Sequence, residues 1–361
     1  MGYLRVERLR IESLRNIMEM ELGLKGTRAL FVGGNGAGKT TVLESVYLLA
    51  RGKSFRGRRS GEMTSVGKAK TTVEGDVAEA ASGSRQRISF VRRQSFKEVR
   101  VNGVLMADRS MVAPCFVVRL VGDASSRLLE GEPAVRRGFL DLNLFHVEQS
   151  GGNLLHRFKR SLEQRNAWLR GGGQGRAVWD APFVASGREL HCAREGLFGE
   201  LNEEFVGLSQ DFGFLSGSRL VLRSGWRDDQ SLAEALFADR KGERMAGYTR
   251  VGPHRADFGV SGQLGDVCWS RGQVKVLVCL LQLAFDRVQT RHLGCGSIWL
   301  LDDLWAELDG ESSRAICDLF CSAGGQCLFT AVGDDRTEIL RDLPSDTQMF
   351  HVERGAIVDA S

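Results

Sequence analysis

The sequence predicts an α/β protein in which one parallel sheet is split by a large, mainly helical insertion. Residues 33–40 read Gly-x4-Gly-Lys-Thr and lie between the apolar run 29–32 and a predicted helix over 39–50. About 270 residues later, the apolar run 298–301 ends in two carboxylates. Both patterns serve one nucleotide site in phosphate-loop proteins, so the two ends of the chain are expected to meet in one sheet.

The N-terminal ~115 residues are expected to be β-rich around this one helix. Residues 5–11 and 18–24 alternate apolar and polar side chains, as half-buried strands do. Residues 98–101 and 104–106 flank Asn102-Gly103, which is a strong signal for a two-residue hairpin. The phosphate-loop helix is therefore expected to lie among several strands.

The middle of the chain is predicted to be mostly helical. Glu132-Pro133 opens one helix, and apolar residues recur at helical spacing over 154–169. The glycine-rich segment 171–175 separates this helix from a second long one over about 183–205. The two could form an antiparallel pair, but heptads are not sustained, so no long coiled coil is expected.

These elements indicate two domains made from three segments. Residues 1–122 and 248–361 are expected to form the two halves of the domain that holds the split sheet, because strands and helices alternate again from 248 onward. Residues 123–247 are expected to form the inserted helical domain.

The glycines of the 33–40 motif let the backbone fold around phosphates with its N–H groups pointing inward. Lys39 can reach the β and γ phosphates of ATP, and the Thr40 hydroxyl can ligate Mg²⁺. The residues expected to hold the nucleotide here are Gly33, Gly34, Asn35, Gly36, Ala37, Gly38, Lys39, Thr40 and Thr41.

The carboxylates that end the 298–301 run are Asp302 and Asp303. In phosphate-loop enzymes the first such carboxylate holds Mg²⁺, usually through water, and the next can orient or deprotonate the attacking water. We therefore assign Asp302 to the metal and Asp303 to catalysis together with Lys39, with Glu307 as the next candidate base. The alternative is that the pair only forms a turn.

A third motif, Ser270-Arg271-Gly272-Gln273, precedes an apolar helix over 274–285. Ser-x-x-Gln is a capping box, which is a purely structural interpretation. The same geometry gives a helix N-terminus with free N–H groups and a hydroxyl, which is an anion site. Ser-x-Gly-Gln resembles the signature motif of ABC-type ATPases, so Ser270, Gly272 and Gln273 are candidate nucleotide contacts.

Composition limits the class of protein. The 361 residues are 42% hydrophobic and 26% charged, and no run of about 18 apolar residues suggests a membrane span. Eight cysteines occur without a Cys-x2-Cys pair, which favours buried reduced thiols in a cytoplasmic protein. The formal charge of +4 is mild, so nucleic-acid binding has to be argued from local clusters.

Taken in order along the chain, these motifs resemble the RecF family, bacterial recombinational-repair ATPases with an ABC-type head like that of the SMC group. The N-terminal matches are Leu14-Arg15-Asn16, the 33–40 loop, Leu43-Glu44-Ser45-Val46 and Lys53-Ser54-Phe55-Arg56. The middle matches are Leu129-Glu130-Gly131-Glu132-Pro133, Arg136-Arg137-x-Phe139-Leu140-Asp141 and Leu162-Glu163-Gln164-Arg165-Asn166. The C-terminal matches are Gly252-Pro253-His254-Arg255-Ala256-Asp257, Ser270-Arg271-Gly272-Gln273-x-Lys275, Leu301-Asp302-Asp303 and Glu307-Leu308-Asp309.

The resemblance implies an ATP-driven homodimer with weak, DNA-stimulated ATP hydrolysis. ATP and Mg²⁺ would be sandwiched between the phosphate loop of one subunit and Ser270–Gln273 of the other. The family binds double-stranded DNA and gap junctions, and works with RecO and RecR to help RecA load at gaps and stalled forks. Arg15 and Asn16 would line the nucleotide pocket, the alternative being an exposed strand end.

Several positions depart from the family pattern. Arg119 stands where a lobe-connecting Gln is usual, Trp305-Ala306 stands where a small residue and Ser are usual, and no switch His follows the run 327–331. These departures concern the rate of hydrolysis rather than nucleotide binding. His254 lies in a family motif, but a turn with a packed histidine is an equal interpretation and the sequence gives it no chemical role.

Basic residues cluster after the phosphate-loop helix. No carboxylate occurs within this cluster. It consists of Arg51, Lys53, Arg56, Arg58 and Arg59, with Phe55 among them. It is expected to contact DNA phosphates, the alternative being a solvated loop. A second, weaker candidate is the set Arg85, Arg87, Arg92 and Arg93 on the predicted hairpin.

Two other classes of protein share parts of this pattern. The ATPase subunit of a membrane transporter has the loop and the signature, but its motifs are less widely separated and the Arg-rich loop has no role there. A small-molecule kinase has the phosphate loop, but Ser270–Gln273 and the carboxylate pair argue against it.

Overall fold

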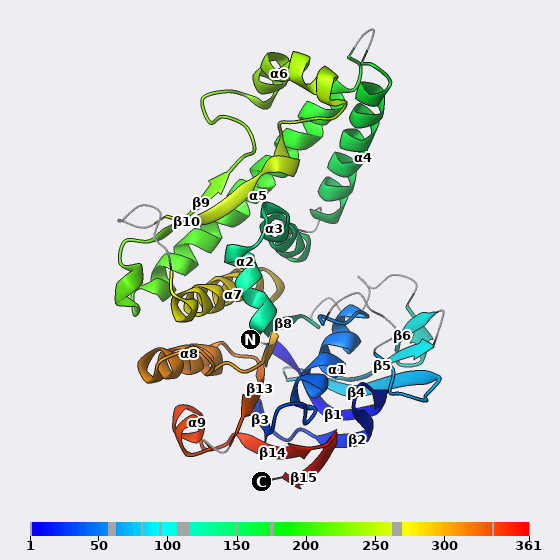
Figure 1. Cartoon of the computed structure of the whole chain (residues 1–361), viewed down its shortest axis with the longest axis vertical. Helices are drawn as coiled ribbons and strands as arrows, with labels where there is room; N and C mark the ends of the chain where they lie inside the picture. The colour runs from blue at the N-terminus through cyan, green and yellow to red at the C-terminus, as the bar shows by residue number, and fades with distance from the viewer. Residues whose placement is uncertain are drawn as a thin grey trace. The chain divides into compact units, whose positions relative to one another are not determined.

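The computed structural model describes residues 2–56, 63–80, 82–93, 96–106, 116–148, 151–173, 177–261, 269–333 and 336–360. The chain divides into two compact units (Figure 1). The first unit joins Met1–Ser125 to Ser270–Ser361, and the second is Ser126–Trp269. Both ends of the chain therefore build the first unit, as the motif spacing predicts.

One sheet of the first unit is formed mainly by the N-terminal segment. Its order is β11-β1-β4-β5-β6-β7, with β2 paired to β1. The strands are β1 (Gly2–Leu14), β2 (Ile17–Gly23), β4 (Lys70–Glu79), β5 (Arg85–Arg93), β6 (Lys97–Val101), β7 (Val104–Leu105) and β11 (Cys295–Gly296). Asn102 and Gly103 join β6 to β7 with φ values of 49° and 80°, which confirms the predicted hairpin.

The second sheet combines strands from both ends of the chain. Its order is β15-β14-β3-β13-β12-β8, and every pairing except β15 with β14 is parallel. The strands are β3 (Arg28–Gly33), β8 (Val118–Val121), β12 (Ile298–Leu301), β13 (Gln326–Val332), β14 (Gln348–Glu353) and β15 (Ala356–Ala360). Strand β13 pairs parallel with both β3 and β12, so the carboxyl ends of β3 and β12 lie at the same edge of the sheet. This arrangement confirms the predicted split sheet.

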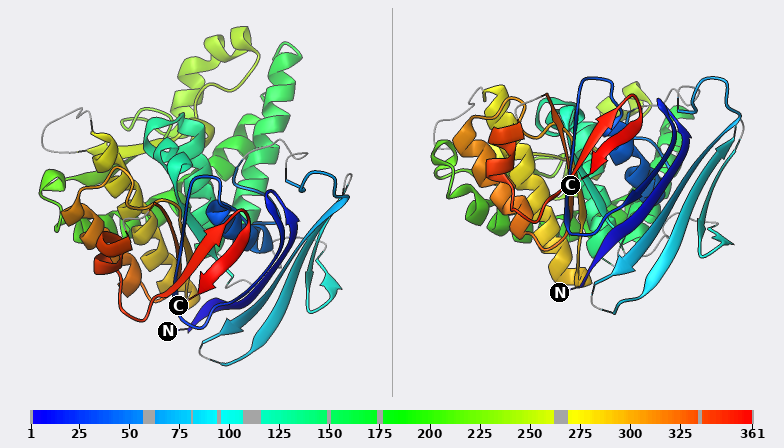
Figure 2. Two further views of the ribbon diagram at one scale, coloured as in Figure 1. Left: turned by 60° about the horizontal axis from the view of Figure 1, so that its bottom comes forward. Right: turned by 90° about the horizontal axis from the view of Figure 1, so that it is seen from below.

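Helix α1 (Lys39–Arg51) packs between the two sheets (Figure 2). Its apolar side chains Val42, Val46 and Leu49 are fully buried. They join a core to which both sheets contribute, and in which Phe31 and Phe350 stack at 5.2 Å between ring centroids. Burial of this helix fixes the position of the loop that precedes it.

In the described part of the first unit, the C-terminal segment adds the helices α7 (Arg271–Leu293), α8 (Gly310–Ser322) and α9 (Arg336–Asp342). Most of α7 is buried, and Trp299 of β12 meets Phe320 of α8 edge to face at 4.8 Å. These contacts hold the C-terminal segment on the second sheet. Across the described residues, every helix is too short or too polar to cross a lipid bilayer.

The second unit is mostly helical. Its elements are α2 (Arg127–Glu130), α3 (Pro133–Val147), α4 (Gly151–Arg170), α5 (Asp180–Ser209), β9 (Arg219–Arg223), α6 (Leu232–Ala246) and β10 (Asp257–Ser261). Helices α4 and α5 pair antiparallel, because Ser161 bonds Ser186 (2.7 Å) and Arg165 bonds Asp180 (2.9 Å). With 20 and 30 residues, the pair is short, as the lack of sustained heptads predicts.

The boundary expected at residue 248 differs from the structure. Residues 248–269 belong to the second unit, because β10 pairs antiparallel with β9 and so closes the helical unit with a two-stranded sheet. The second unit likewise begins at Ser126 rather than at 123. A sequence can indicate strand type but not strand partner, so the pairing of β10 with β9 is not predictable from it.

His254 is a packed residue of this second unit. Its ring lies 6.2 Å and 6.3 Å from the rings of Phe183 and Phe158, and its Nε2 lies 2.9 Å from the Thr249 carbonyl oxygen. Burial lowers the pKa of His254 from 6.5 to about 4, so the ring is neutral at pH 7. With an acceptor carbonyl opposite it, Nε2 carries the hydrogen.

Candidate nucleotide-binding site

The loop between β3 and α1 has the backbone shape that the glycine pattern predicts. Gly33 has φ 157°, and a Cβ there would lie 2.2 Å from the Val352 carbonyl oxygen, so only glycine fits. Gly38 precedes α1 with φ 118° and provides no side-chain cap. The first N–H groups of α1 are therefore available to an anion at the positive end of the helix dipole.

Lys39 folds back over this loop. Its Nζ donates hydrogen bonds to the carbonyl oxygens of Gly33 (2.8 Å) and Gly34 (2.9 Å). Burial lowers the pKa of Lys39, while Asp303 and Asp302 act in the opposite direction. The ammonium group is thus held at the loop beside the two carboxylates.

Asp302 ties the end of β12 to the phosphate-loop helix. Its Oδ1 accepts hydrogen bonds from Thr40 Oγ1 (2.9 Å) and Thr330 Oγ1 (2.6 Å). The Thr330 hydroxyl in turn accepts from the Asp303 backbone N–H (3.0 Å). This hydroxyl and carboxylate set consists of hard oxygen donors, which suits Mg²⁺. Thr330 was missed in the sequence, although it is the polar residue of the apolar run that forms β13.

Asp303 occupies a strained and poorly solvated position. It has φ 48°, and its Oδ1 is buried without a hydrogen-bond partner in the described part of the chain. Burial and the neighbouring Asp302 carboxylate raise the pKa of Asp303, against the opposing effect of Lys39. A carboxylate with an unused acceptor oxygen at this place can take a hydrogen bond from a water or a ligand.

The loop after Asp303 is held against the start of α7. Lys275 Nζ donates to the carbonyl oxygens of Asp303 and Ala306, both at 2.7 Å. A Cβ at Gly272 would lie 2.6 Å from the Glu307 carbonyl oxygen, so this glycine permits the close approach. The Glu307 side chain lies 3.6 Å from Arg271 in an exposed ion pair, which engages the carboxylate of the second candidate base.

Ser270 caps α7 in the way the structural interpretation predicts. Its Oγ accepts from the Gln273 N–H (3.3 Å), and the Gln273 side chain accepts from the Ser270 N–H (2.9 Å). The capping box is therefore confirmed. It does not exclude the anion site, because the Ser270 hydroxyl hydrogen can still be donated to a ligand.

The turn between β1 and β2 lies against the phosphate loop. Asn16 Nδ2 donates to the Gly36 carbonyl oxygen (2.9 Å), and its Oδ1 accepts from Thr41 Oγ1 (3.2 Å). Arg15 makes two hydrogen bonds to the fully buried Glu44 of α1 (2.8 and 3.1 Å). Arg15 and Asn16 are therefore brought to the loop, and Glu44 is the residue that positions Arg15.

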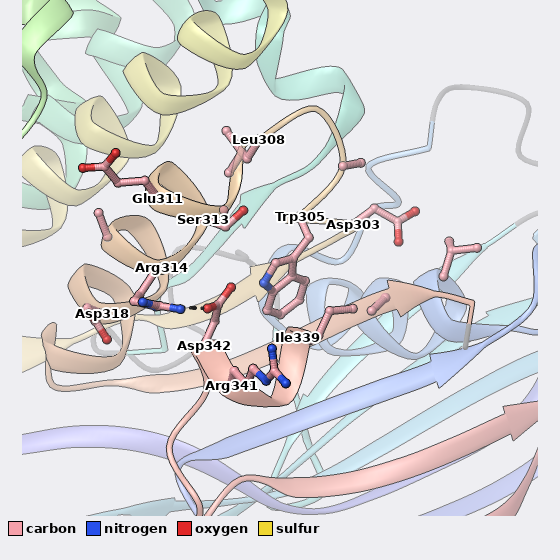
Figure 3. Close-up of a pocket in the computed structure, with 15 residues that line it drawn as sticks. Asp303, Trp305, Leu308, Glu311, Ser313, Arg314, Asp318, Ile339, Arg341 and Asp342 are labelled. Atoms are coloured by element: carbon pink, nitrogen blue, oxygen red, sulfur yellow. Dashed lines mark hydrogen bonds and ion pairs between the residues drawn. The ribbon is translucent and has the colours of Figure 1, made fainter. Parts of the chain in front are cut away.

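A cavity of about 1020 Å³ opens beside Asp303 (Figure 3). Trp305 lines it and packs on Phe329 at 5.5 Å between ring centroids. The indole N–H of Trp305 is buried without a hydrogen-bond partner in the described part of the chain, and Asp342 pairs with Arg314 across the cavity wall. Trp305, which stands where the family usually has a small residue, therefore forms part of the cavity wall next to the Asp303 carboxylate.

The structure places Arg119 within a strand and not at a strand end. It lies within β8 opposite Trp299, is buried, and pairs with Asp286 of α7 at 3.4 Å. At the end of β8 the position next to Asp302 belongs to Gly122, where a Cβ would come within 3.2 Å of the Asp302 Cβ.

The basic cluster after α1 is only partly described. Lys53 and Arg56 are exposed, whereas Arg51 is partly buried at the end of α1 and burial lowers its pKa. Arg56 lies 3.9 Å from Glu44, so this loop shares a carboxylate with Arg15. Arg58 and Arg59 lie outside the described residues. In the second cluster, Arg85 pairs with Glu7 and Arg87 with Asp76.

Comparison with known proteins agrees with this architecture. The model of the "RecF/RecN/SMC N terminal domain" family matches residues 5–356. The chain is 33% identical to the DNA replication and repair protein RecF of Pseudomonas entomophila (strain L48), over 98% of this chain and 97% of that protein. It is 32% identical to the protein of that name from Pseudomonas aeruginosa (strain LESB58), over 97% and 96%.

Solved structures show the same fold. A structure described as the recombination mediator protein RecF-ATP in the RecFOR pathway matches 99% of this chain and 98% of its own, with a TM-score of 0.81 and 21% identity. The Smc head domain of Pyrococcus furiosus matches with a TM-score of 0.59 and 14% identity, over 100% and 96%. With near-complete coverage of relatives that share about a third of its sequence, the chain belongs to the RecF family.

Proposed function

We propose that this protein is an ATP-dependent DNA-binding ATPase of DNA replication and recombinational repair. The observation that carries the proposal is the hydrogen bond between Thr40 and Asp302, which joins the phosphate loop and the carboxylate strand into one site. The relatives named DNA replication and repair protein RecF, and the related structure described as RecF-ATP, support the choice of nucleotide and pathway.

ATP would lie along the loop 33–41 with its phosphates at the N-terminus of α1. Lys39 would exchange its two carbonyl partners for the β and γ phosphates, which are stronger acceptors because they are charged. Thr40, and Asp302 through water, would hold Mg²⁺, which neutralises charge on the phosphates. Asn16 would keep its contact with the loop, and Arg15 would lie beside the nucleotide.

Asp303 is the proposed base that orients or deprotonates the attacking water. Its carboxylate has an unused buried oxygen, and its raised pKa makes it a better proton acceptor than an ordinary aspartate. Glu307, which is paired with Arg271, is the second candidate. Slow hydrolysis is expected, because the site would be complete only when Ser270 and the α7 N-terminus of a second subunit reach the bound ATP.

The anion site at Ser270, Gly272 and Gln273 is proposed to act on ATP bound by a second subunit. In this chain, the first turn of α7 is held against the loop at Glu307, whereas Asn16, Asp302 and Gly355 contact the phosphate loop and its helix. A homodimer would bring the Ser270 hydroxyl and the α7 N–H groups to the γ-phosphate. Since ADP lacks that phosphate, the dimer would depend on ATP.

Double-stranded and gapped DNA are the proposed polymeric ligands, with contacts from Lys53, Arg56, Arg58 and Arg59 and a smaller contribution from the partly buried Arg51. RecO and RecR are the proposed partners, with RecA loading as the outcome, and the cytoplasm is the proposed location. The related structure described as part of the RecFOR pathway supports the first two partners.

Replacement of Lys39 tests this function most directly. Lys39→Ala should lower ATP affinity roughly 10- to 100-fold, because two charge-assisted hydrogen bonds to phosphate are lost. Titration with a fluorescent ATP analogue measures this effect, and gel-shift titration of gapped and plain duplexes with and without ATP measures its effect on DNA binding.

Lys241→Ala on the exposed face of α6 is the matched control, since it removes a lysine charge far along the chain from the loop. A folded Lys39→Ala protein that binds ATP as tightly as the control would contradict the assignment of the site.

A further inference from the structure

The two-stranded sheet of the second unit has one uncovered side. Strand β9 (Arg219–Arg223) pairs with β10 on one side, and within the described part of the chain no strand pairs with its other side (Figure 1). Such an edge presents a row of backbone N–H and C=O groups, which can pair with another extended chain. We call this side of β9 the free edge.

Hydrogen bonds around the sheet show which backbone groups point to the free edge. The Leu220 N–H donates to the Asn202 side chain of α5 at 2.7 Å, so it points away from β10. Because backbone groups alternate in direction along a strand, the Leu222 N–H points the same way. Phe258 lies opposite Leu222 in the register, and its N–H donates to the Asp257 side chain (2.9 Å) rather than to β9. Leu220 and Leu222 therefore supply the polar groups of the free edge.

Asn202 replaces a neighbouring strand at one position only. Its amide oxygen satisfies the Leu220 N–H as the carbonyl of an adjacent strand would. Among the described residues, no side chain or loop carbonyl accepts a hydrogen bond from the Leu222 N–H. The free edge thus has a backbone donor that an added strand can use.

A groove of about 510 Å³ lies beside the free edge. Its walls come from residues 219–222 of β9 and from the part of α5 that contains Phe198, Gly199 and Asn202. A Cβ added at Gly199 would meet no atom within 4 Å, so the space above this residue is open. The volume is in the range of pockets that hold ligands, about 300–1,000 Å³. A short extended segment therefore has room next to β9.

The outward face of β9 carries two arginines. Side-chain alternation places Arg219, Val221 and Arg223 on the face opposite Leu220 and Leu222, and all three are exposed. In the ranges that the structure describes, neither arginine forms an ion pair with a carboxylate. Both guanidinium groups are therefore available to a ligand.

Two carboxylates also line the groove, and they leave these arginines unpaired. Glu195 Oε1 lies 3.3 Å from His191 Nε2, one helical turn away on α5. Asp228 lies in the turn after β9. The positive charge of β9 is therefore not neutralised by its own groove.

A second copy of this chain is a poor occupant of the free edge. Antiparallel self-pairing centred on Val221 would set Arg219 of each copy opposite Arg223 of the other, and like charges directly opposite each other are destabilising. Charged side chains on edge strands commonly prevent such self-pairing. A strand with carboxylates at the two positions instead gains two pairs of opposite charge.

We propose that the free edge of β9 binds an extended segment of a partner protein in which acidic and apolar side chains alternate. The segment would add a third strand and accept a hydrogen bond from the Leu222 N–H. Its carboxylates would lie beside Arg219 and Arg223, and its apolar side chains would lie over the groove at Gly199. Main-chain hydrogen bonds supply affinity in this binding mode, and alternate side chains supply specificity. The interaction needs neither ATP nor DNA, so it is separate from the proposed function.

A short synthetic peptide in which glutamate and valine alternate is the probe. Fluorescence anisotropy of the labelled peptide with the full chain measures affinity, and hydrogen exchange followed by NMR measures protection of single amides. The peptide should bind and slow exchange of the Leu222 amide about tenfold or more at saturation. A peptide of the same composition with all glutamates at one end should bind more weakly, because its side chains no longer match the two faces of a strand.

Two substitutions of one residue separate backbone pairing from side-chain contact. Leu222→Pro removes the N–H of the free edge, and proline is tolerated in a strand where the N–H faces away from the ladder. Leu222→Ala also removes the leucine side chain but keeps the N–H. The proline variant should lose peptide binding, whereas the alanine variant should keep most of it.

Two double variants test the charges. Arg219→Gln with Arg223→Gln should weaken peptide binding about fivefold, because two cross-strand pairs of opposite charge are lost. Arg157→Gln with Arg160→Gln removes two charges from exposed positions of α4 and should leave affinity unchanged. These doubles decide the question of charge even where the proline variant fails to fold, as judged by circular dichroism.

Unchanged exchange of the Leu222 amide with bound peptide would overturn the proposal. So would equal affinity for the alternating peptide and its isomer, or equal loss of affinity in both double variants, because general charge attraction would then be the cause. Wild-type protein that dimerises without peptide, and no longer does so as Leu222→Pro, would make a second copy the occupant and would also overturn it.

Discussion

For Asp303, the sequence predicts the residue type and its place at the phosphate loop, but not its backbone conformation, burial or pKa. Its place after an apolar strand beside Asp302 predicts a carboxylate at the phosphate loop, and the structure brings it there. Its positive φ, its buried acceptor oxygen and its raised pKa depend on Thr330 and on burial by distant segments. Those features require tertiary contacts, which a motif in one sequence does not contain.

Asp303→Asn should keep ATP binding and slow hydrolysis by about 10²- to 10⁴-fold, because the amide cannot accept the proton of the attacking water. A malachite-green phosphate assay with saturating ATP measures turnover, and the fluorescent ATP analogue checks binding. Glu307→Gln is the parallel variant. Full turnover in Asp303→Asn together with loss in Glu307→Gln would transfer the role of the base to Glu307.

The pKa of Asp303 gives this variant a second signature. A folded-state pKa above the unfolded value means that the contribution to stability is complete below the unfolded pKa and is lost as pH rises through the folded pKa. Burial and the Asp302 carboxylate disfavour the charged form of Asp303, so near neutral pH this carboxyl opposes folding. Asp303→Asn should raise the melting temperature at pH 7, and this gain should shrink on acidification.

His254 offers a pH test of the second unit. Its pKa is lowered to about 4 in the folded protein, so the folded state resists protonation. A lowered histidine pKa means that stability falls as pH drops from about 6.5 towards 4, by up to about 3 kcal/mol. His254→Gln keeps an N–H donor for Thr249 but cannot titrate, so its unfolding free energy should depend less on pH over this range.

Urea unfolding monitored by circular dichroism at pH 7 and pH 5 measures this effect. His156→Gln, which changes an exposed histidine of α4, is the matched control and should keep the wild-type pH dependence. If His254→Gln and His156→Gln lose stability equally on acidification, the buried ring is not the cause.

At the scale of elements, short sequence motifs predict local backbone geometry correctly where that geometry depends only on residues close in sequence. The 33–40 glycines, the Asn102-Gly103 turn and the Ser270–Gln273 cap all have the predicted geometry, because each depends on neighbours in sequence. Register and partner choice could not be predicted in the same way. The sequence does not show that Arg119 lies buried opposite Trp299, or that β10 pairs with the distant β9 in the second unit.

The loop after α1 should contribute to DNA affinity without sequence preference. Arg56→Ala, Arg58→Ala and Arg59→Ala together should weaken duplex binding and reduce the salt slope by about one unit per lost phosphate contact. Fluorescence anisotropy with labelled duplexes of unrelated sequence measures both quantities.

A control triple removes the same charge from arginines that are exposed and already ion-paired, namely Arg8, Arg157 and Arg227. A loop triple with the same salt slope as this control would show that the loop is only a solvated surface.

At the scale of the whole molecule, the wide separation of the two motifs was the most useful sequence signal. It predicts one sheet completed by both chain ends, and the parallel ladder β3-β13-β12 confirms it. The helical insertion was predicted from periodicity, but its limits depend on which strands pair. The proposed composite site belongs to the same scale, because the phosphate loop and Ser270–Gln273 lie on different elements of one chain.

ATP should drive association of two subunits, with Ser270 of each acting on the nucleotide held by its partner. Sedimentation should show monomer with ADP and dimer with ATP, because ADP lacks the phosphate that the α7 N-terminus would bind. Lys39→Ala and Ser270→Arg should each be inactive alone. Their mixture should recover part of the DNA-stimulated ATPase, because one site of the heterodimer combines Lys39 of the Ser270 variant with Ser270 of the Lys39 variant.

The recovery requires that one intact site is enough for turnover, and it should rise with the fraction of heterodimer when the mixing ratio is varied. Lys39→Ala mixed with Asp303→Asn is the control, since both changes lie in the half-site of one chain and every composite site then lacks a residue from its own subunit. Its ATPase should stay near background. Wild-type protein that remains monomeric with ATP while it turns over at full rate on DNA would rule out the shared site.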